Sequence, residues 1–131
     1  MKIAVMAAGG MGAYFGANLL AAGRDVSFIA RGAHLEEIKR TGLTLKGDGG
    51  DHLIKPVVAS DDPRDIGPVD AVLFCVKLYD VEEAASAILP VLGPDTIVIS
   101  VLNGVDGPNR IGSVIGTERV LGGAAYASAV I

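Results

Sequence analysis

The sequence has one cysteine, two histidines and no tryptophan among its 131 residues. A single cysteine cannot form an internal disulfide, and Cys75 stands inside the apolar run 72–76, which predicts a buried thiol of the core. His34 and His52 have no other histidine, cysteine or cluster of acidic residues at ligand spacing. We therefore expect neither a disulfide nor a metal site.

A stripe of basic residues is also missing. The formal net charge is -4, and residues of both signs are mixed along the chain. Nucleic acid and anionic membranes therefore have no electrostatic reason to bind. The apolar run 3–8 near the amino terminus breaks at Gly9, too early for a signal sequence or a spanning helix, so we expect a cytoplasmic protein.

The chain is long enough, and with 50% hydrophobic residues apolar enough, for one compact domain over residues 1–131. Short apolar runs alternate with stretches of helical spacing. The runs predict strands over 2–6, 25–30, 70–76, 96–102 and from Val120, and the spacing predicts helices over 10–22, 33–41 and 108–115, with a further one after Asp80. This alternation predicts an α/β fold with a doubly wound, mostly parallel sheet.

Two helices are predicted to present particular faces. In the first helix the apolar face is expected to contain Met11, Phe15, Leu19 and Ala22, and Gly23 is expected to end the helix. In the helix after Asp80, Glu83 would complete a capping box. The expected face of that helix is Val81, Ala84, Ala85, Ile88 and Leu89.

The middle of the chain follows another pattern. Short strands over 43–46 and 52–58 flank a glycine-rich stretch and predict a hairpin, in which Pro56 indicates an edge position. Residues 60–68 are expected to form a loop, in which Asp61 and Asp62 serve a turn rather than acid–base chemistry.

A glycine-rich turn follows the first predicted strand and opens the first helix. It is the G-x-G-x-x-G pattern with alanine at the first position, formed by Ala7, Ala8, Gly9, Gly10, Met11 and Gly12. In this position the turn is typical of a Rossmann domain, where glycine lets the backbone approach a pyrophosphate and the helix amides attract its charge. The alternative is that Gly12 and Gly16 serve only close packing of helix on strand. Alanine in place of the first glycine is tolerated only if its backbone keeps a negative φ, because a Cβ opposes left-handed geometry.

Arg31 stands at the end of the second predicted strand, where a carboxylate would bind the ribose 2′-hydroxyl of NAD. A guanidinium instead suits a 2′-phosphate, so Arg31 predicts NADP. Arg24 precedes the strand and Arg40 lies late in the next helix, so both are weaker candidates. The alternative for Arg31 is an ordinary exposed arginine.

Two more polar residues follow apolar strands, at the edge of the sheet where doubly wound folds bind ligands. Lys77 follows the run 72–76 and Asn103 follows 96–102. Each can also be an ordinary surface residue, since lysine often follows a strand and Asn-Gly is a common turn.

Taken together, these motifs resemble the ketopantoate reductase (2-dehydropantoate 2-reductase) family over the whole chain. The resemblance is carried by the turn 7–12 with Tyr14-Phe-Gly-Ala17, by Ala30-Arg-Gly32, Val76-Lys77 and Asn103-Gly104, and by the run 122–129. It implies NADPH-dependent reduction of 2-dehydropantoate to pantoate, a step toward pantothenate. Lys77 and Asn103 would assist at the cofactor and the 2-oxo acid, and Ala129 would offer backbone to the cofactor.

The resemblance also places the general acid, a lysine, in a helical carboxyl-terminal domain outside this chain. The chain stops in the apolar stretch 129–131, so we expect a truncated domain that binds NADP and has negligible reductase activity alone. Three readings stay open: this reductase, a relative acting on another 2-oxo or 3-hydroxy acid, and an NADP-sensing module. The sequence leaves the oligomeric state undecided, and a homo-oligomer is possible.

Overall fold

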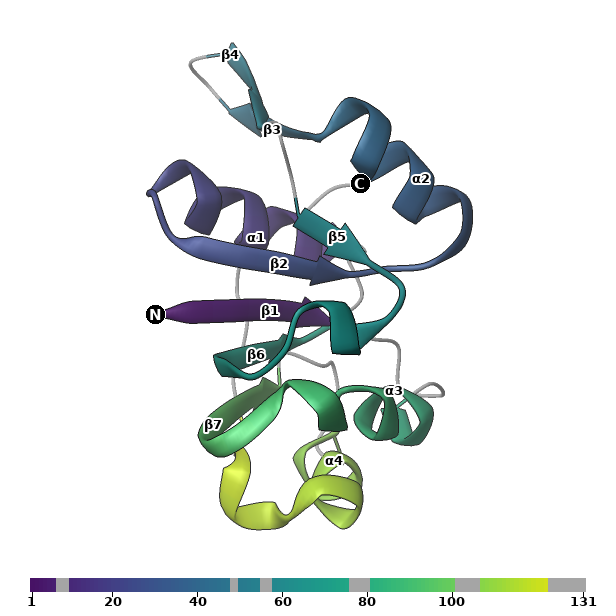
Figure 1. Ribbon diagram of the computed structural model, residues 1–131. Coiled ribbons are helices and arrows are strands. Elements are labelled where there is room, and N and C mark those ends of the chain that lie inside the picture. Colours follow the sequence, from purple (N-terminus) through teal and green to yellow (C-terminus); the bar gives the residue numbers. More distant parts are fainter. Residues whose placement is uncertain (7–9, 48–49, 55–57, 76–80, 101–106, 123–131) are drawn as a thin grey trace.

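The computed structural model describes residues 1–6, 10–47, 50–54, 58–75, 81–100 and 107–122. Over these residues a six-stranded parallel sheet has the order β5-β2-β1-β6-β7-β8 (Figure 1). Its strands are β1 Lys2–Met6, β2 Asp25–Ile29, β5 Val58–Ser60, β6 Val69–Phe74, β7 Leu92–Ser100 and β8 Val120–Gly122. The helices are α1 Gly10–Ala21, α2 Gly32–Thr41, α3 Val81–Ala87 and α4 Gly107–Ile115, with 3₁₀ turns η1 Pro63–Asp65, η3 Leu89–Val91 and η4 Thr117–Arg119.

The sheet grows in two directions from its centre. The chain runs outward through β1, β2 and β5, returns to the other side of β1, and runs outward again through β6, β7 and β8. The order therefore reverses between β1 and β6. The predicted doubly wound parallel sheet is confirmed, and its switch point follows the first strand of the chain.

Two apolar clusters cover the two faces of the sheet. Alternate residues of β1 separate them: Ile3 and Val5 belong to one cluster with residues of α1 and α2, whereas Ala4 belongs to the other with residues of α3 and α4. Figure 1 shows α1 and α2 near the β5-β2 end of the sheet and α3 and α4 near β6 and β7. Burial on both faces explains why the strands are continuous apolar runs rather than alternating ones.

The face by which α1 packs agrees with the prediction in part, since Leu19 packs against the core cluster on this side of the sheet. Gly16 and Ala17 are buried, Phe15 and Leu19 are half-buried, and Ala22 is exposed. A Cβ on Gly16 would lie 2.3 Å from Cζ of Phe28 in β2, so this glycine lets the helix lie close to the sheet. Because α1 is apolar around much of its circumference, periodicity could not select the packed face.

The predicted end of α1 at Gly23 is confirmed. Gly23 has φ of +82°, its N–H donates to the Leu20 carbonyl at 2.9 Å, and the Arg24 N–H donates to the Leu19 carbonyl at 3.0 Å. This is a Schellman motif, whose left-handed residue favours glycine. It turns the chain directly into β2.

The middle of the chain forms a hairpin and a separate sheet strand. Strands β3 Leu43–Gly47 and β4 Gly50–Ile54 pair antiparallel, apart from the main sheet. The single strand predicted over 52–58 is therefore wrong, because its last residue belongs to β5, which pairs parallel with β2. Pro56 lies outside the described residues.

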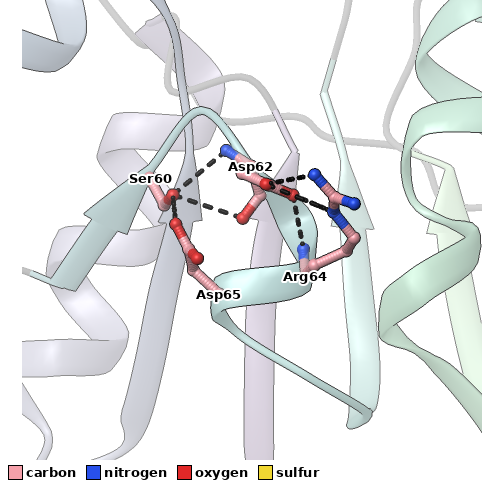
Figure 2. Close-up of polar contacts among 4 residues, drawn as sticks. All are labelled: Ser60, Asp62, Arg64 and Asp65. Atoms are coloured by element: carbon pink, nitrogen blue, oxygen red, sulfur yellow. Dashed lines mark hydrogen bonds and ion pairs between the residues drawn. The ribbon is translucent and has the colours of Figure 1, made fainter.

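The polar segment after β5 folds into a compact turn (Figure 2). The Asp62 carboxylate accepts the Arg64 backbone N–H at 3.0 Å and caps η1. The Ser60 hydroxyl donates to Asp65 at 2.6 Å and accepts the Asp62 N–H at 3.0 Å. The turn role expected for Asp62 is confirmed, but residues 60–68 are not all loop.

Helix α3 ends earlier than the apolar pattern predicts. Val81, Ala84, Ala85 and Ile88 are buried as expected, but Leu89 is 50% exposed. Since Pro90 cannot continue the helix, residues 89–91 turn into η3 and carry the Leu89 side chain away from the core. Asp80, the predicted cap, lies outside the described residues.

A buried hydroxyl holds the start of β7, which begins at Leu92 rather than at Thr96. Thr96 is 3% exposed, and its Oγ1 accepts the Gly93 N–H at 2.7 Å and donates to the Val69 carbonyl.

We expect Thr96→Val to destabilise the domain by about 1–3 kcal/mol, because both backbone groups lose a partner. Urea unfolding measures this, with the exposed Ser113→Ala as a near-neutral control; equal stability of the two variants would contradict it.

Candidate functional site

The carboxyl ends of the strands meet along one edge of the sheet. Met6, the last residue of β1, is aligned with Ile29 of β2 and with Phe74 of β6, and Phe74 is aligned with Ser100 of β7. In Figure 1 the arrowheads of β1 and β2 point toward the side where α2 begins and α3 lies. Of the predicted site residues that the structure describes, Arg31 follows a strand that ends at this edge, and Gly10, Met11 and Gly12 lie in the first turn of α1.

The structure describes part of the predicted phosphate-binding turn. Helix α1 begins at Gly10, so Gly10, Met11 and Gly12 form its first turn, directly after the switch-point strand β1. This turn carries no acidic residue, which leaves the positive end of the helix uncompensated by its own side chains. Ala7, Ala8 and Gly9 lie outside the described residues, as do Lys77, Asn103 and Ala129.

Arg31 directly follows β2 and precedes α2. Its backbone is extended, with φ of -146° and ψ of 163°, and the preceding Ala30 N–H donates to the Ser60 carbonyl at 3.1 Å. Its side chain makes no capping bond to α2, and that helix also has no acidic residue in its first turn. The Arg31 side chain is 76% exposed and accessible to a ligand.

The other two arginines considered from sequence are placed elsewhere. Arg24 is exposed and precedes β2, whose first residue Asp25 is aligned with Lys2 at the amino-terminal edge of the sheet. Arg40 is in the last turn of α2, away from the helix start. Of these three arginines, Arg31 is the one at the carboxyl edge.

A carboxylate that the sequence interpretation assigned to helix capping lies beside Arg31. Oε1 of Glu83, in α3, is 3.6 Å from Nη1 of Arg31, and the Glu83 side chain is 73% exposed. The pair joins the segment after β2 to the helix after β6 across the end of β1. Sequence spacing carries no signal for this contact, because the two residues belong to different βα units.

A second ion pair fastens α3 to α4. The Arg110 guanidinium donates through Nε and Nη2 to the two carboxylate oxygens of Glu82, each at 2.7 Å. This bidentate contact is the main reason that the pKa of Glu82 falls from its ordinary value of 4.5 to about 2. The contact therefore ties α3 to α4 at their exposed surface.

The depressed pKa of Glu82 predicts how the stability of the domain depends on pH. The stabilisation by Glu82 is present above its unfolded-state pKa of 4.5 and is lost as pH falls toward about 2. We therefore expect Glu82→Gln to lower the Tm at about pH 7, and the difference from wild type to shrink steadily down to about pH 3. Thermal unfolding at several pH values measures this, and high salt should reduce the difference. A difference independent of pH would contradict the pairing.

Cys75 follows β6, and its backbone N–H donates to the Met6 carbonyl at 3.2 Å, which extends the pairing of β1 with β6. Burial raises the pKa of its thiol to about 12. A thiol in that state is a poor nucleophile, in agreement with the predicted structural role. The residue is only half-buried, so the prediction of a fully buried core thiol is wrong in that respect.

The described part of the chain lacks two further features. No group of three or more histidine, cysteine, aspartate or glutamate side chains there could hold a metal ion. None of the described helices is both long and apolar enough to span a membrane.

The strand order and the helix that starts at its switch point define a doubly wound Rossmann domain, a class that binds nucleotides at this edge. Within that class, a family model described as ketopantoate reductase PanE/ApbA matches residues 3–131. The chain therefore belongs to the ketopantoate reductase family, whose members are oxidoreductases that use a nicotinamide cofactor.

Individual relatives agree with this. A 2-dehydropantoate 2-reductase of Mesorhizobium japonicum is 37% identical, over 96% of this chain and 45% of its own length. The crystal structure of 2-dehydropantoate 2-reductase from Porphyromonas gingivalis W83 is 41% identical with a TM-score of 0.86, over 98% of this chain and 47% of that chain. A ternary structure of D-mandelate dehydrogenase with NADH and anilino(oxo)acetate is 31% identical with a TM-score of 0.84, over 95% of this chain and 40% of that chain. The chain thus spans less than half the length of these relatives.

Proposed function

We propose that this chain is the NADP-binding domain, residues 1–131, of an NADPH-dependent 2-dehydropantoate 2-reductase. The observation that carries the cofactor choice is Arg31, which is exposed at the carboxyl edge beside the start of α2. Neither α1 nor α2 has an acidic residue in its first turn, so both helix starts favour phosphate groups. A small 2-oxo acid substrate, a role in pantothenate synthesis and a cytoplasmic location belong to the same proposal.

Within this proposal each group has a defined task. The backbone of residues 7–12 holds the pyrophosphate, and Arg31 holds the 2′-phosphate through its planar donors. When bound, the cofactor supplies a hydride to the ketone carbon of the substrate. Lys77 and Asn103 orient the 2-oxo acid and stabilise negative charge on its oxygen, and Ala129 contributes backbone contacts.

The complete reaction is proposed only for a protein that also contains the part of the relatives that this chain does not span. The general acid that protonates the alkoxide, a lysine by family resemblance, is expected there. We expect the 131-residue chain to bind NADPH without measurable reduction of 2-dehydropantoate. Substantial turnover by this chain would place the general acid within it.

Isothermal titration of the purified chain with NADPH, NADH, 2′,5′-ADP and 5′-AMP tests the proposal. Tighter binding of NADPH than NADH, and of 2′,5′-ADP than 5′-AMP, is the expected result. Equal affinities for the two members of each pair would overturn the assignment of NADP. Binding of none of the four would overturn the proposed function itself.

A second candidate substrate class rests on the D-mandelate dehydrogenase structure, which contains NADH and anilino(oxo)acetate. By analogy, a protein that contains this chain and also the part of the relatives that it does not span would reduce a larger 2-oxo acid, and the chain would bind NADH. The same titration separates the candidates at the level of the cofactor, and assays of the full-length protein on 2-dehydropantoate and an aryl 2-oxo acid separate them at the level of the substrate.

A further inference from the structure

The Arg31–Glu83 pair lies at the point where the proposed cofactor would place its 2′-phosphate. Among the described residues, Glu83 is the one carboxylate within ion-pair distance of the Arg31 guanidinium. The contact, at 3.6 Å, is longer than a good charge-assisted hydrogen bond, and both side chains are about three-quarters exposed. A pair of this kind is weak and exchanges its partner readily.

We propose that Glu83 is the counter-ion that the 2′-phosphate displaces from Arg31, so that Glu83 lowers the preference of this domain for NADP over NAD. The inference rests on the proposed function, since it requires Arg31 to bind the 2′-phosphate. A phosphate that reaches the guanidinium brings a charge of the same sign as the carboxylate to within a few ångströms. The carboxylate therefore has to move away, and it repels the phosphate while it stays close.

The surroundings of Glu83 make it a modulator rather than a structural group. Its side chain is 73% exposed, whereas the neighbouring Glu82 is held by Arg110 through two hydrogen bonds of 2.7 Å. The two glutamates are adjacent on the same helix and carry the same charge. Of these two glutamates, Glu83 is the one within ion-pair distance of Arg31, so the two residues provide a test and a control.

A ligand without the 2′-phosphate does not compete with Glu83 for the guanidinium. Removing the carboxylate should therefore increase the affinity for NADPH and 2′,5′-ADP much more than the affinity for NADH and 5′-AMP. A general increase in positive potential would improve the binding of all four ligands in proportion to their charge, and it would follow from Glu82→Gln as much as from Glu83→Gln.

The experiment titrates wild type, Glu83→Gln and Glu82→Gln with these four ligands at low salt, with the Tm of each variant as a check of folding. We expect Glu83→Gln to bind NADPH and 2′,5′-ADP about three- to tenfold more tightly than wild type, with NADH and 5′-AMP changed less than about twofold. Glu82→Gln should leave NADPH affinity unchanged, and about 0.5 M salt should shrink the gain of Glu83→Gln.

The possible failures are distinguishable. If wild type prefers NADPH but Glu83→Gln does not bind it more tightly, the inference is overturned and the proposed function stands. Weaker NADPH binding by Glu83→Gln would show that the carboxylate positions Arg31 for the ligand, and an equal gain for NADH or for Glu82→Gln would show a general charge effect; each overturns the inference. If wild type shows no preference for the 2′-phosphate, both proposals are overturned.

Discussion

Replacing Arg31 by alanine is expected to weaken NADPH binding by about 10- to 100-fold and to leave NADH binding almost unchanged. Hydrogen bonds to charged groups contribute about 1.5–3 kcal/mol each in net terms, which corresponds to that range. Within the described part of the chain, the ion-pair partner of the guanidinium is Glu83, which is itself exposed, so losing the pair should cost the fold little. The change should therefore appear in affinity and not in Tm.

Two further variants sharpen the Arg31 experiment. Arg31→Lys retains the charge but loses the planar donor fork, so an intermediate loss of NADPH affinity is expected. Arg24→Ala removes the same charge from the opposite, amino-terminal edge of the sheet and should bind NADPH as wild type does. Equal losses for Arg24→Ala and Arg31→Ala would mean that net charge, rather than a 2′-phosphate contact, governs affinity.

Gly16→Ala is expected to destabilise the domain by about 1–3 kcal/mol, the usual cost of forcing an extra carbon into a packed core. The new Cβ would lie 2.3 Å from Cζ and 2.5 Å from Cε1 of Phe28, and 3.3 Å from Cγ2 of Val5. Phe28 is completely buried, so its ring cannot turn out into solvent to relieve the contact. Helix α1 would have to lift from the sheet, and its first turn would leave the position proposed for the pyrophosphate.

Urea unfolding and NADPH titration of Gly16→Ala measure these two effects. Gly93→Ala is a matched control, because its Cβ would meet Thr96 and Pro68 at ordinary distances of 3.5 and 3.6 Å. Replacing the opposing ring by a smaller side chain, in the double variant Gly16→Ala/Phe28→Leu, should recover part of the lost NADPH affinity if the clash moves the helix. An alanine in a helix is otherwise favoured over glycine by about 1 kcal/mol, so a neutral or stabilised Gly16→Ala would refute the close packing.

Much of the fold is predictable from the sequence. The strands β1, β2 and β6 are buried on both faces and are therefore short apolar runs, which local pattern detects. Gly23 ends α1 because the turn there needs a positive φ, a requirement that is local and visible in one residue. Arg31 could be placed at a strand end for the same reason, since β2 and α2 are adjacent in the sequence.

Other features depend on contacts between distant segments. The sequence pattern predicts one strand over 52–58, but in the structure β4 pairs with β3 and β5 pairs with β2. The position of these partner strands in space determines where each strand begins and ends. The packed face of α1 was decided by the fit of Gly16 against Phe28 rather than by apolar periodicity. Side-chain volume at a packing contact has no periodic signature.

The type of sheet, the glycine-rich turn after the first strand and the arginine after the second are predictable from the sequence, because each depends on residues that are neighbours along the chain. The strand order and the carboxylate that faces this arginine depend on contacts between distant segments. The Arg31–Glu83 contact exists because β1 separates the two strands that these residues follow, and parallel pairing brings the ends of all three strands to one edge.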